Sequence, residues 1–280
     1  MPANAKTILI TGAAGGIGAA ATRRLAQLGY TVYAGVRSPA PGLDGIDGVR
    51  TLRLDVTDAD DVREAAALVT AETGSLHALV NNAGVIVQGP LELVPISELR
   101  RQFEVNVFGP AQVTAAFLPL LRAGRGRLVN ISAPTARAAV PFMGPISASK
   151  SALESLTDAL RGELAAWKIP ISVIQPSGTD TPIFATAEKA AAESLGTVPP
   201  EVLALYAPAL ASLAKAAAKM KLSPVDPVVE AIVHAVQSRK PKPRYTVGRD
   251  AKAAAGLAKL PISLRTALVL RALGIKIKSA

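Results

Sequence analysis

The sequence predicts an α/β fold in which helices cover both faces of a parallel, doubly wound sheet. Apolar, strand-like runs alternate along the chain with longer helical patterns, as expected for such a sheet. Half of the 280 residues are hydrophobic, which is ample for a sizeable core. No internal repeat or low-complexity linker divides the chain, so we expect one domain over residues 1–280.

Seven strands are expected, six in the main alternation and one late in the chain. Thr57 is expected to cap a helix that starts near Asp58, and Ser97 a helix after Pro95. Gly74 and Gly124 lie where helices should end. The expected strands cover residues 7–10, 31–35, 49–54, 78–80, 127–131, 171–174 and 244–247.

One stretch interrupts the alternation after the sixth strand. Residues from about 182 to 222 are rich in alanine, have a helical pattern and precede a helix that begins near Asp226. An insertion beyond the carboxyl end of a strand is where an α/β enzyme builds a substrate lid. We therefore expect a helical lid there.

The net charge of +10 is concentrated at the C-terminal end. Eleven Lys and Arg residues but one acid, Asp250, lie at or after Arg239, whereas residues 1–238 are balanced with 20 of each sign. A local basic surface, and no nucleic-acid partner, is expected. The extension from about 249 to 280 has helix-compatible spacing and either packs on the domain, which we favour, or lies on an anionic membrane. Its basic residues include Lys252, Lys259, Arg265 and Arg271, and its leucines Leu257, Leu260, Leu264, Leu268 and Leu270.

Composition excludes several kinds of chemistry. The chain has no cysteine, so it has no disulfide, thiolate nucleophile or cysteine-bound zinc, and His77 and His234 are too few for a histidine-rich metal site. The N-terminal residues lack a secretory-signal pattern, and no uninterrupted apolar run is long enough to span a membrane. We expect no metal and a cytoplasmic location.

A glycine-rich turn follows the first expected strand. Residues 11–18 read Thr-Gly-Ala-Ala-Gly-Gly-Ile-Gly and lead into a helix. Glycines there allow a tight turn and let the backbone approach a pyrophosphate, whose charge the helix N-terminus stabilises. Alone, such a turn is also compatible with an ordinary strand-to-helix loop.

Further motifs follow in order, and with the turn they make six. Together they resemble those of the short-chain dehydrogenase/reductase family, over roughly residues 6–248, which implies a Rossmann-type fold. The motifs are Asp55 after the third strand, Asn81-Asn82-Ala83-Gly84 after the fourth, Asn106 in the next helix, Ser149-Lys150-Ser151-Ala152-Leu153 and Pro176-Ser177-Gly178-Thr179-Asp180-Thr181.

The resemblance implies roles for these residues. Asp55 would bind the adenine ring, Asn106 would be a structural and proton-relay residue, and Lys150 would bind the nicotinamide ribose. The loop after the sixth strand would hold the carboxamide. The implied cofactor-binding residues are Gly12, Ala14, Gly15, Gly16, Ile17, Asp55, Val56, Asn82, Ala83, Gly84, Ile131, Lys150, Pro176, Gly178, Thr179 and Thr181.

Cofactor choice is set at the end of the second strand. NAD enzymes place an acid there for the ribose 2′-hydroxyl, whereas NADP enzymes offer a cation to its phosphate. Here Val36 is followed by Arg37, with no acid before Asp44. NADP(H) is therefore expected, the alternative being that Arg37 is an ordinary surface residue.

The chain departs from the family where proton chemistry takes place. The family has a tyrosine four residues before the helix lysine and a serine thirteen before that tyrosine, positions that Ile146 and Ala133 occupy here. Loss of a general acid costs about 10²–10⁴ in rate, and loss of an oxyanion donor about 10²–10³. Of the four tyrosines, only Tyr206 in the expected lid is a plausible substitute.

Three functions stay open. The first, which we favour, is an NADPH-dependent reductase of an apolar substrate whose iminium, conjugated alkene or carbonyl is protonated by water or a lid residue. The second is a non-redox catalyst or a catalytically retired binding protein that keeps the cofactor. The third is a membrane-surface protein that uses the basic extension. The resemblance also implies a homodimer or homotetramer, through helices that begin near Asn106 and Ser147.

Overall fold

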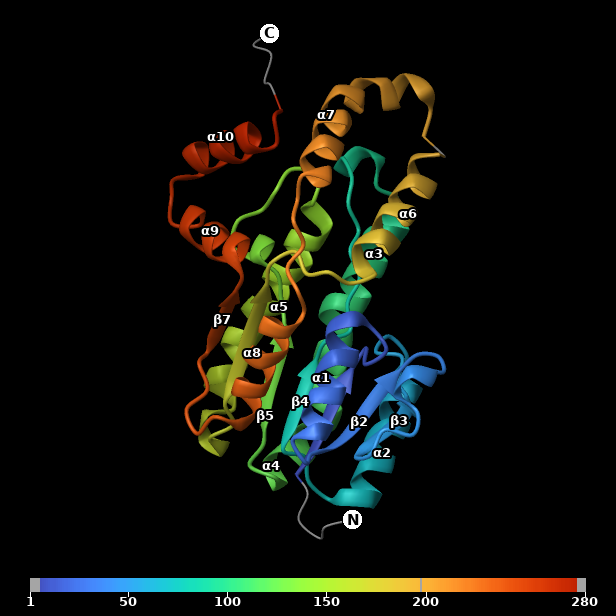
Figure 1. Cartoon of the computed structure of the whole chain (residues 1–280), viewed down its shortest axis with the longest axis vertical. Coiled ribbons are helices and arrows are strands. Elements are labelled where there is room, and N and C mark those ends of the chain that lie inside the picture. Colours follow the sequence, from blue (N-terminus) through green and yellow to red (C-terminus); the bar gives the residue numbers. More distant parts are fainter. Residues whose placement is uncertain (1–5, 197, 276–280) are drawn as a thin grey trace.

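Seven parallel strands form a single sheet in the order β3-β2-β1-β4-β5-β6-β7 (Figure 1). The computed structural model describes residues 6–196 and 198–275. All seven predicted strands are confirmed, with small differences at their ends. They are β1 (Thr7–Thr11), β2 (Thr31–Val36), β3 (Val49–Arg53), β4 (Ala78–Asn81), β5 (Arg127–Ile131), β6 (Ile171–Pro176) and β7 (Arg244–Val247).

The strand order creates a crevice between β1 and β4. The chain runs outward from β1 through β2 to β3 and then returns to the other side of β1, where Ile10 is in register with Val80. At such a switch point the loops after the two strands diverge, and ligands bind at the carboxyl ends of the strands. The glycine-rich turn after β1 and the Asn-Asn-Ala-Gly motif after β4 both lie there.

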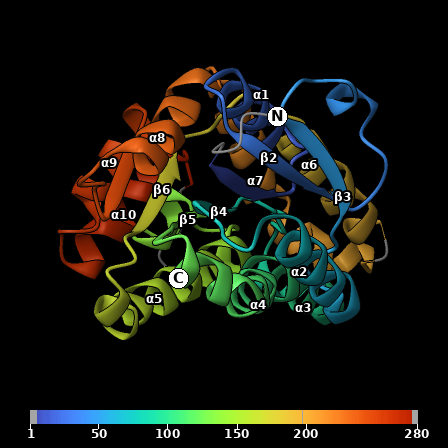
Figure 2. The ribbon, with the colours of Figure 1, turned by 90° about the horizontal axis from the view of Figure 1, so that it is seen from below.

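Helices cover both faces of the sheet (Figure 2). α1 and α8 contact one face, and α2, α4 and α5 the other. The helices are α1 (Gly16–Gln27), α2 (Ala59–Thr73), α3 (Ile96–Phe103), α4 (Gly109–Ala123), α5 (Gly144–Glu163), α6 (Ile183–Leu195), α7 (Pro200–Ala218), α8 (Asp226–Gln237), α9 (Arg249–Leu257) and α10 (Ile262–Ala272). Short 3-10 segments include η2 (Leu91–Leu93) and η4 (Pro134–Ala136), and residues Glu104–Phe108 form a π-helical segment, η3.

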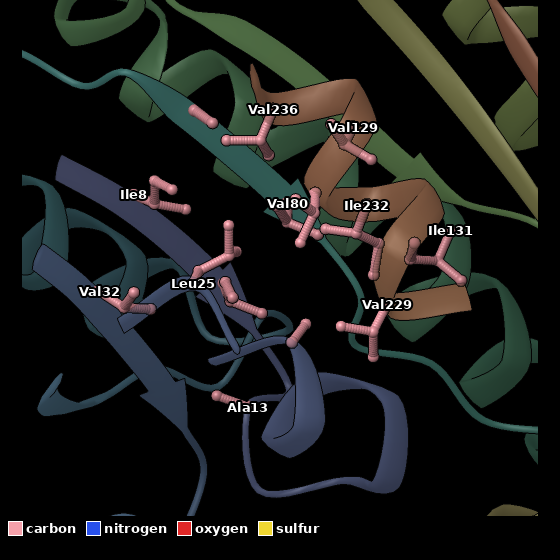
Figure 3. Packing of buried hydrophobic residues seen from close by; sticks show 14 of the residues in the cluster. Ile8, Ala13, Leu25, Val32, Val80, Val129, Ile131, Val229, Ile232 and Val236 are labelled. Atoms are coloured by element: carbon pink, nitrogen blue, oxygen red, sulfur yellow. The ribbon is translucent and has the colours of Figure 1, made fainter. Parts of the chain in front are cut away.

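The larger core lies between the sheet and the helices α1 and α8. Figure 3 shows Ile232 of α8 beside Val80 and Ile131 of the central strands, with Leu25 of α1 completing the layer. Ile232 and Leu25 are completely buried. This packing fixes the carboxyl ends of the strands, and with them the loops that form the site.

Two of the predicted helix caps are wrong. Asp58, not Thr57, caps α2, because its carboxylate accepts hydrogen bonds from the backbone N–H groups of Asp60 (2.9 Å) and Asp61 (3.2 Å), while the Thr57 hydroxyl is bound to Asp55. Ser97 lies inside the first turn of α3 and caps nothing. The two predicted helix ends are confirmed: Gly74 ends α2 in the left-handed conformation, and Gly124 follows α4.

The insertion after β6 forms α6 and α7, at the end of the molecule beyond the strands' carboxyl ends (Figure 1). No described residue of α7 is buried. By length and composition, α7 is apolar enough to cross a bilayer, with a mean hydropathy of 1.3, although Glu201 and Lys215 interrupt its apolar run. That the insertion acts as a lid stays a prediction.

The C-terminal extension forms two helices, α9 and α10, separated near Pro261. Ala251 of α9 and Val269 of α10 are buried, and α9 contacts β7 and η4. That the whole extension packs on the domain stays a prediction. Leu264 and Leu268 are instead exposed. The last residues of the extension, 276–280, lie outside the described residues.

Candidate active site

The glycine-rich turn after β1 needs two of its glycines for steric reasons. Gly12 has φ +63°, and a Cβ there would lie 2.8 Å from the Cα of Ala83. A Cβ on Gly18 would lie 2.4 Å from the carbonyl oxygen of Gly12 and 2.6 Å from the side-chain nitrogen of Asn82. Any side chain at either position would therefore displace the turn or the loop after β4.

Polar side chains tie the turn to the end of β4. The Asn82 amide donates to the carbonyl oxygens of Thr11 and Gly12, both at 3.0 Å. The buried Thr11 hydroxyl accepts from the backbone N–H groups of Asn82 and Ala83, also at 3.0 Å. The two motifs that the sequence placed after separate strands thus form one rigid unit.

The N-terminus of α1 is open to a ligand. Its N-cap, Gly15, offers no side-chain cap, so the first N–H groups of the helix keep their hydrogen-bonding capacity and the positive end of its dipole. The loop after β6 approaches this turn, since a Cβ on Gly16 would lie 2.4 Å from the Thr181 methyl carbon. Gly15, Gly16 and Thr181, with the neighbouring Ala14 and Ile17, therefore surround a cradle suited to a pyrophosphate.

Arg37 extends from the end of β2 beside the turn. The backbone N–H of Ala13 donates to the carbonyl oxygen of Gly35 at 3.0 Å, which holds the turn against β2. Arg37 is exposed and forms no ion pair with any described residue. Its guanidinium is thus available to a phosphate at the same edge of the sheet.

Asp55 and Val56 follow β3 in a strongly bonded loop. The Asp55 carboxylate accepts from the backbone N–H and hydroxyl of Thr57, at 2.9 and 2.7 Å. The Asp55 backbone N–H donates to Asp61, and this bond, chief among several causes, lowers the pKa of Asp61. Val56 is buried and packs on Gly109. The loop is therefore held in place without using the second carboxylate oxygen of Asp55.

Asn106 lies in the π-helical segment and is completely buried. Its side-chain oxygen accepts from the backbone N–H of Val85 at 2.9 Å, and its nitrogen donates to the carbonyl oxygen of Val85 at 3.0 Å. Gln102, one helical turn earlier, binds the same loop through Val87 N–H (2.6 Å) and the Val85 carbonyl (2.9 Å). Both amides also contact the Ser149 hydroxyl of α5. The two side-chain amides thus bind the backbone N–H and C=O groups of the loop after Gly84, as a neighbouring strand would.

Lys150 is buried near these groups. Its ammonium donates to the carbonyl oxygen of Ile131 at 2.7 Å, and a Cβ on Gly84 would lie 3.6 Å from its Nζ and 3.4 Å from the Asn106 side-chain oxygen. Burial lowers the pKa of Lys150 to about 8, an effect that the Glu154 carboxylate opposes. The structure thus brings together Gly84, Asn106, Ile131 and Lys150. Their binding of a cofactor stays a prediction.

The hydroxyl of Ser147, three residues before Lys150 on α5, is not free, because it donates to the carbonyl oxygen of Met143 at 2.6 Å. No hydroxyl stands four residues before Lys150. Ile146 occupies that position and is 4% exposed. Ala133 follows β5 in an extended conformation and precedes η4. The neighbouring Ser132 is no substitute, because its hydroxyl donates to Glu154 at 2.6 Å in the buried interface between α5 and the sheet. Glu154 also accepts from Gln175 (2.7 Å) and from Arg244.

The tyrosine hydroxyls all have partners elsewhere or lie on other surfaces. Tyr206 of α7 donates to Glu92 of η2 at 2.5 Å, and this hydrogen bond raises the pKa of Tyr206. Tyr33 is bonded to Glu72, Tyr245 to His234, and Tyr30 stacks on His77. The structure therefore does not bring Tyr206 to Lys150.

An apolar hollow adjoins this loop. Its cavity volume is about 20 Å³, room for about one water molecule, and it lies between α6 and the segment that Gln102 and Asn106 hold. Its lining includes Ile86, Val87, Leu93, Ala190, Ala191 and Leu195. Among the described residues, no group of three or more His, Cys, Asp or Glu side chains is placed to hold a metal ion.

Sequence reasoning missed Gln102, Ser149 as a partner of the amides, and the Ser132–Glu154 bond. Gln102 and Asn106 are separated by four residues, so they share one helical face, and that spacing is the available signal. The Ser132–Glu154 bond joins a strand end to a helix 22 residues later, and no local pattern indicates it.

Known proteins share this architecture. The reductase of 3-amino-tetrahydro-pyrrolizinone from Xenorhabdus hominickii is 38% identical over 181 residues, 64% of this chain and 63% of that protein. Estradiol 17-beta-dehydrogenase 2 of Mus musculus is 33% identical over 269 residues, 90% of this chain and 70% of that protein. A short chain dehydrogenase from Burkholderia cenocepacia, solved in complex with NADP, has a TM-score of 0.72 at 28% identity and covers 98% of this chain and 99% of that one.

The short chain dehydrogenase family matches residues 6–192, about two thirds of the chain. This range contains the glycine-rich turn, the motif after β4, Asn106, Lys150 and the loop after β6. Together with the seven-stranded Rossmann-type sheet, it shows that the chain belongs to the short-chain dehydrogenase/reductase family.

Proposed function

We propose that the chain is an NADP(H)-dependent reductase of a small apolar substrate whose C=N, C=C or C=O group needs no tyrosine acid. One observation carries this proposal. Gly84, Asn106 and Lys150 meet at the crevice, whereas the residue one turn before Lys150 is the buried Ile146. The groups that would hold a cofactor are kept, and the group that would protonate a substrate is replaced.

The residues around the turn fit a dinucleotide. The close packing of Gly12 and Gly18 leaves no room for side chains, and the open N-terminus of α1 suits a pyrophosphate. Asp55 and Val56 would contact the adenine, and Asn82, Ala83, Gly84 and Ile131 the middle of the cofactor. Lys150 would bind the nicotinamide ribose, and Pro176, Gly178, Thr179 and Thr181 the carboxamide and pyrophosphate. Arg37 would bind the 2′-phosphate, and the related Burkholderia protein has NADP bound.

The bound cofactor would supply a hydride. The chain's own residues then have three tasks: Asn106 holds the loop beneath the substrate, Lys150 orients the ribose, and Ile146 excludes water from one side of the reacting group. Any proton that completes the reduction would come from water. An iminium suits this site best, because hydride addition gives a neutral amine and needs no proton. Hydride addition to a conjugated alkene gives an enolate, and addition to a carbonyl gives an alkoxide; each would take its proton from water.

An apolar substrate is supported by the buried Ile146, which makes the site beside Lys150 more apolar. The hollow beside the loop after Gly84 is too small, at about 20 Å³, to hold a substrate itself. Its lining is mostly aliphatic, with Glu98 as its charged member. The relatives are named for a pyrrolizinone and for estradiol, both ring compounds with few polar groups.

Arg37→Ala tests the cofactor. NADPH affinity, measured by cofactor fluorescence, should fall by roughly 10–100-fold, because charge-assisted hydrogen bonds to the 2′-phosphate are lost. NADH affinity should not change. Arg63→Ala, at an exposed arginine of α2, is the matched control. Equal affinities for NADPH and NADH in the wild type would remove the argument from Arg37.

The pair Ala133→Ser and Ile146→Tyr tests the active site. If these residues occupy the family's serine and tyrosine positions, the double variant should gain NADPH-dependent reduction of small apolar ketones and aldehydes, with Lys150 already present to lower the tyrosine pKa. Neither single variant should suffice, because the two groups act as a unit. A folded double variant that binds NADPH and binds the ketone by calorimetry, yet shows no gain, would contradict this placement.

A second function, a non-redox catalyst or a retired NADP(H)-binding protein, is favoured because the hydroxyls of Tyr33, Tyr206 and Tyr245 are hydrogen-bonded to groups other than Lys150. A substrate panel of imines, enals and ketones separates the two. NADPH consumption with any of them supports the reductase, and tight NADPH binding without consumption supports the second function.

We also propose a cytoplasmic homodimer or homotetramer, with no nucleic-acid partner. The helices expected to form the subunit interface are α4 and α5. Phe108, just before α4, is 55% exposed, and Leu156 of α5 is 44% exposed. Light scattering after size exclusion tests the assembly, and a Leu156→Glu variant should shift it towards monomer.

A further inference from the structure

One face of α10 is apolar and exposed, although Val269 of the same helix is buried. Val269 is the buried residue of α10. Leu264 and Leu268 are 47% and 39% exposed, and Ile262 at the helix start is 73% exposed. An ordinary surface helix would carry polar residues there.

These exposed residues form a single stripe with a cation at its end. Leu264, Ala267, Leu268 and Arg271 are separated by three or four residues and all are exposed, so they lie along one face of the helix. Lys259, immediately before α10, is also exposed. No acid follows Asp250 in the sequence. The face thus combines leucines with uncompensated positive charge.

The neighbouring part of the surface continues this character. α7 lies at the same end of the molecule as α10 (Figure 1), and its Leu205 is 74% exposed. Arg265 of α10, which is half-buried, donates to the carbonyl oxygen of Arg137 at 3.5 Å and adds a further positive charge to the helix.

We propose that the outward face of α10 docks peripherally on an anionic lipid surface, with Leu264 and Leu268 in the acyl boundary and Lys259 and Arg271 among the headgroups. Helices that lie in a membrane interface combine an apolar stripe with flanking cations in this way.

The charge pattern favours lipid over a second copy of the chain. A two-fold contact through α10 would be self-complementary and would bring Lys259, Arg265 and Arg271 against the same cations of the partner copy. Like charges across an interface oppose association. Anionic headgroups neutralise those cations and accept the leucines at the same time.

Co-sedimentation of the full chain with vesicles of phosphatidylcholine, with and without phosphatidylglycerol, tests the proposal. Binding should require phosphatidylglycerol and should weaken in high salt, because screening reduces the attraction between the cations and the headgroups. Arg271→Gln should lower the partition coefficient about fivefold. Leu264→Ser with Leu268→Ser should lower it at least about tenfold.

Matched controls lie on the opposite end of the molecule. Arg63→Gln removes an exposed arginine from α2, and Leu28→Ser with Leu68→Ser removes two leucines that are 36% and 44% exposed. These variants should bind vesicles as the wild type does, and circular dichroism checks that all variants are folded. Equal loss in the control and α10 variants, or no binding to phosphatidylglycerol vesicles at all, would overturn the proposal. A concentration-dependent dimer that the α10 leucine variants dissociate, without vesicle binding, would identify a second copy as the occupant instead.

Discussion

The two sides of the crevice differ in what their polar groups and close contacts stabilise. On the side of β1 and β4, Gly12, Gly18, Thr11 and Asn82 are locked together by contacts that allow no side chain and by hydrogen bonds of 3.0 Å. On the other side, where β5 leads into α5, polar side chains bind one another inside the core and so stabilise the fold. Ser132, for example, donates to Glu154. The difference teaches that, within one fold, the binding surface and the reacting surface can depend on separate sets of contacts. Four changes test this contrast.

The largest effect is expected for Gly18→Ala. The new Cβ would overlap the Gly12 carbonyl oxygen and the Asn82 amide, so the turn must shift away from the position that suits a pyrophosphate. NADPH affinity should fall about 100-fold or more, and the free energy of unfolding by about 1–3 kcal/mol.

Gly162→Ala is the matched control for that change. Nothing lies within 4 Å of the added methyl group on this exposed residue of α5, so the variant should bind NADPH normally and gain about 0.5–1 kcal/mol in stability. Calorimetry with NADPH and urea unfolding provide the two readouts. Normal NADPH affinity in Gly18→Ala would show that the turn is more compliant than its packing indicates.

Lys150→Met should stabilise the chain without cofactor and weaken its function. Because burial lowers the pKa of Lys150 from 10.5 to about 8, the unfolded chain holds this proton more tightly, and stability rises with pH between about 8 and 10.5. At pH 7 the variant should gain about 1–3 kcal/mol in the free energy of unfolding, and the gain should shrink as the pH approaches 10.

Urea unfolding at several pH values measures this difference. Lys189→Met, at an exposed lysine of α6, should show no such pH-dependent gain. A Lys150→Met variant that is less stable than the wild type at pH 7 would mean that the ammonium is well solvated, against its burial.

Ser132→Ala should lower the free energy of unfolding by about 1–2 kcal/mol, because Glu154 loses a buried donor. NADPH affinity and any reductase activity should remain unchanged, since the hydroxyl points into the interface with α5. Ser155→Ala, at an exposed serine of the same helix, should have little effect on either. A large loss of activity in Ser132→Ala would assign a catalytic role to this serine and remove the contrast.

The smallest effect is expected for Tyr206→Phe. The hydroxyl binds Glu92 on the surface, so its removal should leave NADPH oxidation with the best substrate within about twofold of the wild type. Glu92→Gln, which keeps an acceptor for Tyr206, is the control. Brisk ketone reduction by the wild type that Tyr206→Phe abolishes would show that the lid supplies the acid.

The parts of the site that could be predicted from the sequence are those that depend on local geometry. Short sequence motifs predict the strands, the glycine-rich turn and the proximity of Asn106 to Lys150. In each of these motifs, neighbouring residues determine both the backbone conformation and the element that follows. The sequence does not distinguish Thr57 from Asp58 as the cap of α2, because both residue types cap helices well. In the structure the Thr57 hydroxyl is bound to the Asp55 carboxylate, which leaves Asp58 as the cap.

Features that depend on distant partners could not be predicted. Glu154 accepts hydrogen bonds from Ser132, Gln175 and Arg244, which lie on or next to three different strands. No single segment of the sequence therefore indicates this cluster. The sequence predicts that the leucines of α10 pack on the domain, but Leu264 and Leu268 are exposed. An amphipathic pattern does not show which apolar residues of a helix are buried.

The π-helical segment Glu104–Phe108 has a consequence for how the chain tolerates changes in length. A π turn holds one residue more than an α turn, so deletion of one residue there would allow α3 and α4 to join as an uninterrupted α-helix. α3 and α4 would keep their orientation relative to each other, because the deletion removes the one residue by which the π turn exceeds an α turn. Asn106 lies at the centre of this turn, so the deletion would move it by one position relative to Gln102, and the two amides could no longer bind the Val85 loop together. Homologous chains should therefore vary freely in length between α6 and α8, yet keep the spacing from Gln102 to Asn106 residue for residue.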